Sequence, residues 1–199
     1  DLYGLTLEEI NHGMDGGLYA ELIQNRSFED GMPPLNCPYD ATRNVLITPN
    51  GWTIPFLRSD SLPGWRRLNP AVTQLYPDTR ELINERNRRS LLVAVSATSE
   101  SGPGGVVAEG YRGIPLRQGK RYRCSFYAKG TSLVPRNIWV GLADEQVTTA
   151  LSEVYEVAPI PEWRRYEHTF TATADVPDAV LALTSDTTNM FWIDMVSLF

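Results

Sequence analysis

The sequence predicts an all-β protein, a β-sandwich of the jelly-roll type, and two observations lead to this prediction. Beyond residue 89, short runs alternate between apolar and polar residues with a period of two, as in strands that bury one face. Gly, Pro and Asp separate these runs, and no apolar pattern of helical length follows Gln24. Many short strands joined by turns are typical of sandwiches and jelly rolls.

The predicted strands are each four to ten residues long, and each has one face rich in Val, Ile, Leu, Phe or Tyr. They cover 91–95, 106–114 with an interruption at Gly110, 121–128, 138–142, 151–157, 166–173, 180–184 and 191–198. Two of them indicate which side chains face solvent. In the run 121–128 the apolar residues share one face, which leaves Arg123 and Tyr127 on the other. In the run 138–142 the same reasoning places Trp139 on the outer face.

The sandwich is predicted to open with a strand at 25–31, which lies beside the closing run 191–198. Phe28 is then buried, and an exposed Phe28 would contradict this division of the chain. The region 31–89 is predicted to be a long loop, because Pro and Gly interrupt it repeatedly.

The residues before the sandwich form a short unit of a different kind. A possible strand at 2–7 is followed by a Gly-rich turn and by about two helical turns at 18–23, which are marginal without a partner. This is the first part of a βα unit, and a single such unit has no sheet to cover its apolar face. We therefore divide the chain at residue 24 into 1–24 and 25–199, and expect 1–23 to be mobile or to pack opportunistically.

Composition excludes several classes of partner. A net charge of -6 argues against nucleic acid or an anionic membrane surface, and no apolar run approaches the roughly 20 residues of a membrane span. The chain holds two cysteines. Cys124 lies in a strand and is predicted to be buried, while Cys37 lies in a Pro-rich loop, so neither a metal nor a redox site made of these two cysteines is expected.

No catalytic constellation is predicted in this chain. Hydrolysis by a carboxylate pair, one acting as acid and one as nucleophile, needs the two groups about 5–5.5 Å apart. Glu8 and Glu9 are neighbours on a strand and point to opposite faces, and Glu85 is predicted to lie in a solvated loop among arginines. His168 alternates with apolar residues as a core or core-edge residue, and His12 has no visible partner. We expect the fragment to be catalytically silent.

Two motifs carry a resemblance. Residues 2–12 read LYGLTLEEINH and residues 15–29 read DGGLYAELIQNRSFE, which closely resembles the start of family 51 α-L-arabinofuranosidases. The resemblance implies that 1–24 begins an incomplete (β/α)8 catalytic barrel, whose remainder would be a partner of this chain. It also implies that Glu8 contacts arabinose, though only in the full enzyme, and that the protein is secreted or periplasmic.

The remainder of the chain is similar to carbohydrate-binding modules of families 4 and 9, a galactose-binding-like fold. The motifs that carry this similarity are 25–31, PGW at 63–65, EWRRYE at 162–167 and FWIDMVSL at 191–198. The similarity implies a carbohydrate ligand of the arabinan or arabinoxylan type. It also implies a structural calcium held by Glu29 and Asp194, since carboxylate oxygens are the ligands that calcium prefers. The alternative is that Asp194 caps a turn or pairs with an arginine.

Sugar recognition needs an aromatic platform for the apolar face of the ring and hydrogen-bonding groups for its hydroxyls. If their strands lie side by side, Arg123, Tyr127 and Trp139 line one concave surface, and Tyr111 and Trp65 reach its rim from loops. Trp163 and Trp192 are assigned to structural roles.

Two functions stay open. The chain is a carbohydrate-binding accessory module, or it is a structural insert that packs on the barrel and shapes its active site without binding sugar. An open groove with Arg123, Tyr127 and Trp139 exposed favours the first, and a face covered by the region 31–89 favours the second.

Overall fold

A computed structural model describes residues 21–56, 62–96, 102–131 and 136–199. Its strands are β1 (Tyr39–Asp40), β2 (Val45–Ile47), β3 (Thr53–Pro55), β4 (Trp65–Leu68), β5 (Thr73–Asp78), β6 (Ser90–Val95), β7 (Gly104–Ala108), β8 (Ile114–Leu116), β9 (Arg121–Gly130), β10 (Ile138–Ala143), β11 (Tyr155–Val157), β12 (Arg164–Thr171), β13 (Val176–Ser185) and β14 (Asn189–Leu198). Across these four ranges there is no helix, and so none that could span a membrane.

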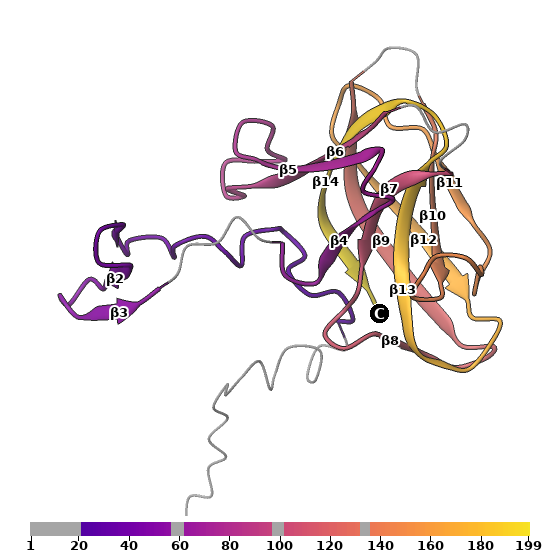
Figure 1. Cartoon of the computed structure of the whole chain (residues 1–199), viewed down its shortest axis with the longest axis horizontal. Coiled ribbons are helices and arrows are strands. Elements are labelled where there is room, and N and C mark those ends of the chain that lie inside the picture. The colour runs from indigo at the N-terminus through magenta and orange to yellow at the C-terminus, as the bar shows by residue number, and fades with distance from the viewer. Residues whose placement is uncertain (1–20, 57–61, 97–101, 132–135) are drawn as a thin grey trace, which may run out of the picture.

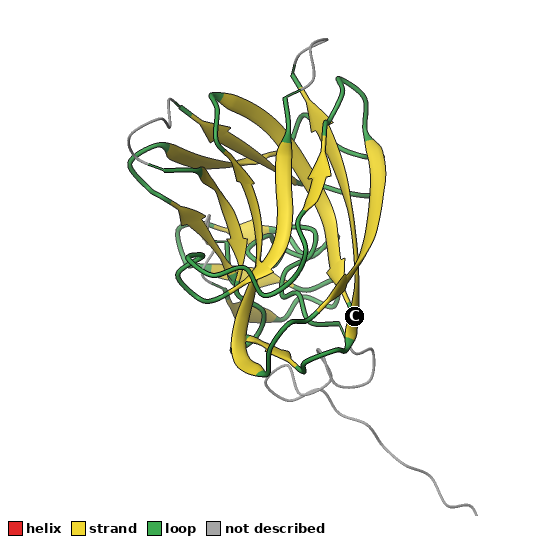
Figure 2. Ribbon diagram, turned by 90° about the vertical axis from the view of Figure 1, so that its right-hand side faces the viewer, coloured by secondary structure: helices red, strands yellow, loops and turns green. Residues whose placement is uncertain are grey.

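Two antiparallel sheets form a β-sandwich jelly roll (Figures 1 and 2). One sheet has the order β11-β10-β13-β7-β4, with β8 paired to the end of β13. The other has the order β12-β9-β14-β6-β5. The all-β class and the sandwich architecture predicted from the alternation are confirmed.

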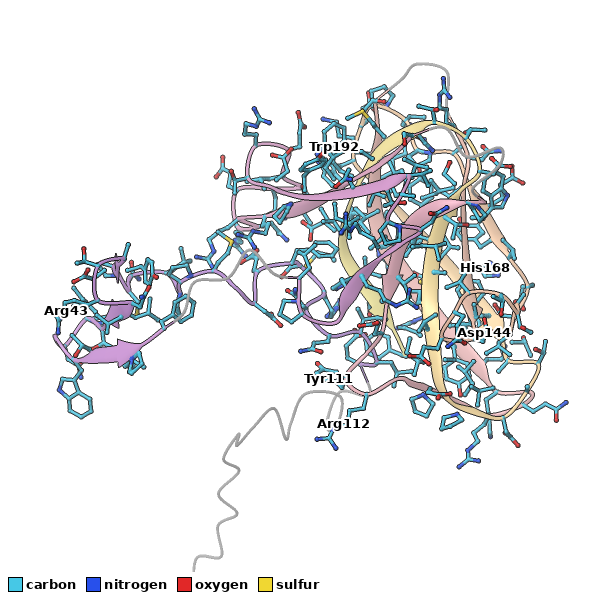
Figure 3. The ribbon with its side chains drawn as sticks, viewed as in Figure 1. Arg43, Tyr111, Arg112, Asp144, His168 and Trp192 are labelled. Carbon is cyan, nitrogen blue, oxygen red and sulfur yellow. The ribbon has the colours of Figure 1, made fainter. Side chains whose placement is uncertain are left out.

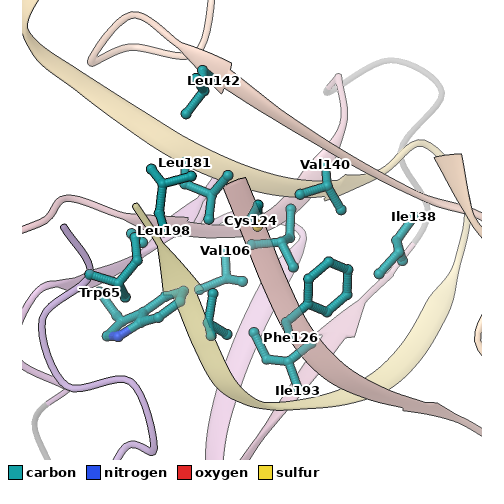
Figure 4. Close-up of a cluster of buried hydrophobic side chains, with 14 of the residues drawn as sticks. Trp65, Val106, Cys124, Phe126, Ile138, Val140, Leu142, Leu181, Ile193 and Leu198 are labelled. Atoms are coloured by element: carbon teal, nitrogen blue, oxygen red, sulfur yellow. The ribbon is translucent and has the colours of Figure 1, made fainter. Parts of the chain in front are cut away.

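Alternating apolar residues fill the space between the sheets (Figure 4). Phe126 and Ile193 come from the five-stranded sheet, and Val140 and Leu181 come from the other sheet, all of them at most 1% exposed. Cys124 is buried among them, and this burial is the main reason why the pKa of its thiol is raised to about 12. The face assignment made for the runs 121–128 and 138–142 is therefore confirmed.

The region 31–89 is not one long loop, and that prediction is corrected here. β4 and β5 belong to the sandwich. Pro77 lies inside β5, although proline cannot donate a hydrogen bond to a neighbouring strand. It is tolerated because β5 is the edge strand of its sheet. A proline that marks a loop in sequence can equally mark a sheet edge.

The predicted opening strand at 25–31 is wrong, because this segment is a series of turns. Asn25 and Phe28 have φ angles of 53° and 61°, and two left-handed residues in close succession cannot continue an extended strand. The predicted position is nonetheless correct. The carbonyl of Arg26 accepts a hydrogen bond from the Val196 N–H in β14 at 3.1 Å, and Phe28 is completely buried.

Residues 21–23 also belong to the sandwich and are not helical. The Glu21 carboxylate accepts hydrogen bonds from the Ser197 hydroxyl at 2.7 Å and from the Leu198 N–H at 2.9 Å. Ile23 is 1% exposed within the core. The expectation that all of 1–23 packs loosely therefore fails for its last three residues, and its first twenty lie outside the described residues.

Strands β1, β2 and β3 form a separate three-stranded sheet, which we call the arm (Figure 1). Figure 1 shows β2 and β3 standing apart from the two large sheets. The Tyr39 and Phe56 rings meet edge to face at 5.9 Å, while Trp52 is 72% exposed. So small a sheet buries little apolar surface of its own.

Candidate functional site

The outer face of the six-stranded sheet carries a groove of about 250 Å³. Its floor consists of β10 and β13 residues, and its walls are the loop 144–150 and the segment before β11. The residues that line the groove include Trp139, Gly141, Val147, Thr148, Val154 and Thr184.

Trp139 is in this groove because of strand alternation. Its neighbours Ile138 and Val140 point into the core and are fully buried, so the indole projects outward and is partly exposed. Gly141, two residues further along, projects to the same side without a side chain. A Cβ at Gly141 would meet no atom closer than the Glu153 carbonyl oxygen at 3.6 Å, so space remains above the strand beside the indole.

Polar groups surround the indole. The Asn137 amide donates a hydrogen bond to the Glu156 carboxylate across β10 and β11. Thr184 lies opposite Trp139 on β13, and its hydroxyl donates to the Trp139 carbonyl at 3.4 Å. An apolar floor with amide, hydroxyl and carboxylate groups at its edge suits a small neutral ligand that is itself both apolar and hydroxylated.

The Asp144 carboxylate stabilises the wall 144–150 from within. Asp144 accepts hydrogen bonds from the Thr148 N–H and hydroxyl, both at 2.6 Å, and from the Thr149 N–H at 2.9 Å. These hydrogen bonds stabilise the charged form of Asp144 and so lower its pKa, and the one from the Thr148 side chain has the largest effect.

A second hollow, of about 370 Å³, lies next to Tyr111 and Arg112. Figure 3 shows these two residues at the lower end of the sandwich, with Trp192 at the upper end. Glu109 lines the hollow and forms an ion pair with Arg66 at 2.8 Å. Tyr111 is thus placed at a hollow, as a loop aromatic, but this hollow is separate from the Trp139 groove.

The expected common surface of Arg123, Tyr127 and Trp139 is wrong. β9 and β10 belong to different sheets, so the outer faces on which Tyr127 and Trp139 lie point away from each other. Arg123 and Tyr127 do share a face, where the Arg123 guanidinium lies 5.9 Å from the centre of the Phe199 ring. Alternation indicates whether a residue faces the core, but it does not reveal which sheet a strand joins.

The outer face of the five-stranded sheet is partly covered by the segment 78–88. Asp78 accepts a hydrogen bond from the Trp192 indole N–H at 3.0 Å, and Asn87 donates to Asp194 at 3.2 Å. The two faces of the sandwich therefore differ, since one is partly covered by part of the region 31–89 and the other holds an open groove.

Trp65 is not a rim residue, which corrects another expectation. It lies in β4, is 6% exposed, and its ring centre is 4.9 Å from that of Phe28. Its indole N–H donates to the carbonyls of Gln24 and Asn25 at 3.0 and 3.1 Å. Trp65 thus fastens the N-terminal segment to the core. The predicted contact residue Glu8 lies outside the described residues.

Glu29 and Asp194, the predicted calcium ligands, lie close enough to interact electrostatically. Asp194 is fully buried, and burial is the main cause that raises the pKa of its carboxyl to about 7; the negative charge of Glu29 adds to it. Hydrogen bonds from the Met195 N–H and the Asn87 amide act in the opposite direction.

The oxygen chemistry of this pair fits a calcium ion, and a buried carboxylate beside a second one would gain from a cation. Arg88 competes for the same place, because its N–H and guanidinium bind both oxygens of Glu29 at 3.0 and 3.1 Å. In the described part of the chain no third His, Cys, Asp or Glu joins the pair, so carbonyl oxygens and water would have to complete the shell.

Sequence reasoning missed most of the groove. Thr148, Val154 and Thr184 have ordinary side chains for exposed positions, and nothing local marks them. The one available signal was Gly141, a glycine inside a strand, which often marks a place where another group approaches the backbone closely.

Comparisons with known proteins agree with this fold. A family described as carbohydrate binding domain matches residues 83–189. An extracellular exo-α-L-arabinofuranosidase of Streptomyces chartreusis is 34% identical over the whole chain, and α-L-arabinofuranosidase 1 of Arabidopsis thaliana is 31% identical over 98% of it. The chain spans only 20% and 26% of the length of these two relatives.

Solved structures give the same result. An arabinose-bound family 51 α-L-arabinofuranosidase superposes on the entire chain with a TM-score of 0.73 and 25% identity, and the chain covers 29% of it. A structure described as CBM4 superposes on 70% of this chain and 96% of its own with a TM-score of 0.53 and 22% identity, which supports the fold.

Proposed function

The chain belongs to the carbohydrate-binding domain family, and on this premise we propose that it binds a carbohydrate in the Trp139 groove. The observation that carries the proposal is the partly exposed Trp139 indole beside the space above Gly141, on the open face of the sandwich. An indole face can pack on the C–H face of a sugar ring. Glu156, Thr148 and Thr184 would then provide hydrogen-bonding groups for the ring hydroxyls.

We propose arabinose-containing plant polysaccharide, of the arabinan or arabinoxylan type, as the ligand class. Relatives matched over nearly the whole chain are named α-L-arabinofuranosidases, which supports the proposal. The name of the Streptomyces relative includes the word extracellular, and we propose secretion on that basis. We also propose that the chain binds without hydrolysing, as a module beside a catalytic barrel of the same polypeptide.

The first test is calorimetric titration of this chain with arabinan, arabinoxylan and xylan oligosaccharides. Trp139→Ala removes the platform, and burial of an aromatic face is worth about 1.5–3 kcal/mol. We therefore expect roughly a ten- to hundredfold loss of affinity. The matched control is Tyr127→Ala, which removes an aromatic ring from the other outer face and should leave affinity unchanged.

A second variant fills the groove and leaves Trp139 intact. A Cβ at Gly141 has room, and valine is favoured in strands, so Gly141→Val should fold and fill the space beside the indole. We expect its binding to weaken as much as that of Trp139→Ala, with an unchanged thermal midpoint. Absence of heat with every oligosaccharide, or equal binding by the parent and by both groove variants, would overturn the proposal.

The arm favours a second candidate function, a structural insert that packs on a catalytic barrel. Trp52 and Ile54 in the arm are 72% and 48% exposed, and Leu35 just before it is 70% exposed, so three large apolar side chains are available to pack on a partner. In a protein that contains the barrel, Trp52→Ala should lower thermal stability, whereas in this chain alone it should change nothing. If sugar binding is absent and Trp52→Ala has the first effect, the structural function is the correct one.

We also propose that Glu29 and Asp194 hold a structural calcium, which would neutralise the buried Asp194 charge. The ion would stabilise the junction between the segment 24–30 and β14 rather than take part in sugar binding, because the pair lies on the other sheet.

A further inference from the structure

The Trp139 groove and the hollow at Tyr111 lie on the same outer face and are separated by the loop 144–150. β13 contributes to both, with Val180 in the hollow and Thr184 in the groove. The loop also contributes to both, with Glu145 on the side of the hollow and Val147 on the side of the groove.

Val147 covers the strip of sheet between the two. The outer face has a small apolar cluster of its own, formed by Val107, Ala143, Val180 and Ala182, and Val147 packs against it. The isopropyl group therefore lies over the place where the groove would otherwise continue along the sheet toward Tyr111.

The backbone at Val147 adopts an unfavourable conformation. Its φ is 59°, in the left-handed region, which a β-branched residue rarely occupies. Such residues persist only where the surroundings determine them, and they are frequent at ligand sites. Glycine or asparagine would be the unstrained choice for the turn, so the turn alone does not explain a valine here.

Neighbouring groups hold the loop 144–150 in place on both sides of Val147. On one side Asp144 binds the backbone of Thr148 and Thr149, as described above. On the other side the Arg66 guanidinium donates to the Glu145 carbonyl and forms the ion pair with Glu109. Val147 is thus a fixed obstruction rather than part of a loop that swings aside.

We propose that Val147 closes one end of the Trp139 groove, so that the site takes the end of a glycan chain or a single side-branch sugar and excludes an internal run of a long chain. This inference rests on the proposed sugar-binding function and deepens it. The volume agrees with it, because about 250 Å³ lies below the roughly 300–1,000 Å³ of sites for larger ligands. A site for internal segments would need a groove that is open at both ends.

The test compares chain lengths. The parent is titrated with linear arabinan oligosaccharides from the disaccharide to the hexasaccharide, and its affinity should stay within about twofold over the series. Val147→Gly removes the side chain and the backbone strain, which joins the groove to the Tyr111 hollow. For this variant we expect the hexasaccharide to bind at least about tenfold more tightly than the disaccharide.

Val147→Asn is the matched control. Asparagine accepts the left-handed conformation and is close to valine in size, so it relieves strain while the obstruction stays. It should show the same length-independence as the parent, which separates the effect of the backbone strain from that of the side chain. A longer-chain preference in Val147→Asn would show that strain, and not the side chain, limits the site, and would overturn the proposal.

Different results would contradict sugar binding in the Trp139 groove and closure of that groove by Val147. If the parent binds the hexasaccharide much more tightly than the disaccharide, the groove is open and only this inference fails. If the parent binds no oligosaccharide of any length, the proposed function fails and the inference fails with it.

Discussion

Asp194→Asn is expected to be more stable than the parent at pH 8 in the presence of a chelator. The parent must keep a charged carboxylate in a fully buried place beside Glu29, whereas asparagine carries no charge. Its carbonyl oxygen can accept the hydrogen bond from the Met195 N–H, and its NH2 group can donate to Asn87 once the Asn87 amide turns its oxygen toward it. The difference between the ordinary pKa of 3.8 and about 7 corresponds to a free energy on the order of 4 kcal/mol.

The pH dependence has a definite sign. The folded pKa of Asp194 lies above the unfolded one, so between about pH 4 and 7 the folded state binds the proton and the unfolded state does not. The free energy of unfolding of the parent therefore falls as pH rises through this window. The advantage of Asp194→Asn should grow over the same window and be constant above it, as measured by urea unfolding.

Asp144→Asn is a control of opposite sign. Hydrogen bonds from Thr148 and Thr149 lower the pKa of Asp144, so its contribution is present above the unfolded pKa and is lost as pH falls through the folded one. This variant should be less stable than the parent at neutral pH and equal to it in acid. A neutral-pH gain in stability for Asp144→Asn, or none for Asp194→Asn, would contradict the account.

Calcium should distinguish the parent from Asp194→Asn. An ion that binds only the folded state raises the unfolding midpoint with its concentration. At pH 8, calcium in place of the chelator should raise the thermal midpoint of the parent and leave that of Asp194→Asn unchanged. Equal shifts in both proteins would show that Asp194 is not a ligand.

The second large effect is expected for Phe28→Ala, which should cost about 3–5 kcal/mol of unfolding free energy. Phe28 is completely buried against Trp65, and it projects from a segment of turns rather than from a strand. Its removal leaves a cavity that the strand framework on either side cannot fill by collapsing. Denaturant unfolding measures the loss directly.

Phe28→Leu is the control, since it keeps most of the volume and should cost less than about 1.5 kcal/mol. Both variants retain the left-handed backbone at position 28, so their difference reports packing alone. If Phe28→Ala costs no more than a typical surface substitution, the segment 24–31 is peripheral to the sandwich and the interpretation of its role is wrong.

Much of the fold could be predicted because local patterns reflect burial. The alternation around Cys124 and Phe126 identified the inner face of β9, and the same logic oriented Trp139 on β10. The burial of Phe28 followed from the junction motif, although its backbone did not, because φ angles of a turn are not encoded in apolar periodicity. His168 lies at the core edge as expected, stacked on Tyr155 at 4.6 Å.

The sequence by itself determined that strands dominate, which side chains of the runs 121–128 and 138–142 face inward, and that Trp139 lies on an outer surface. Only the tertiary structure decided that Tyr127 and Trp139 lie on opposite faces, that Trp65 is buried, and that Val147 packs on the outer face beside the Trp139 groove. The physical reason is that burial is a property of each residue and its near neighbours, and leaves a period in the chain. Sheet membership depends instead on contacts between strands distant in sequence, and no local period records them.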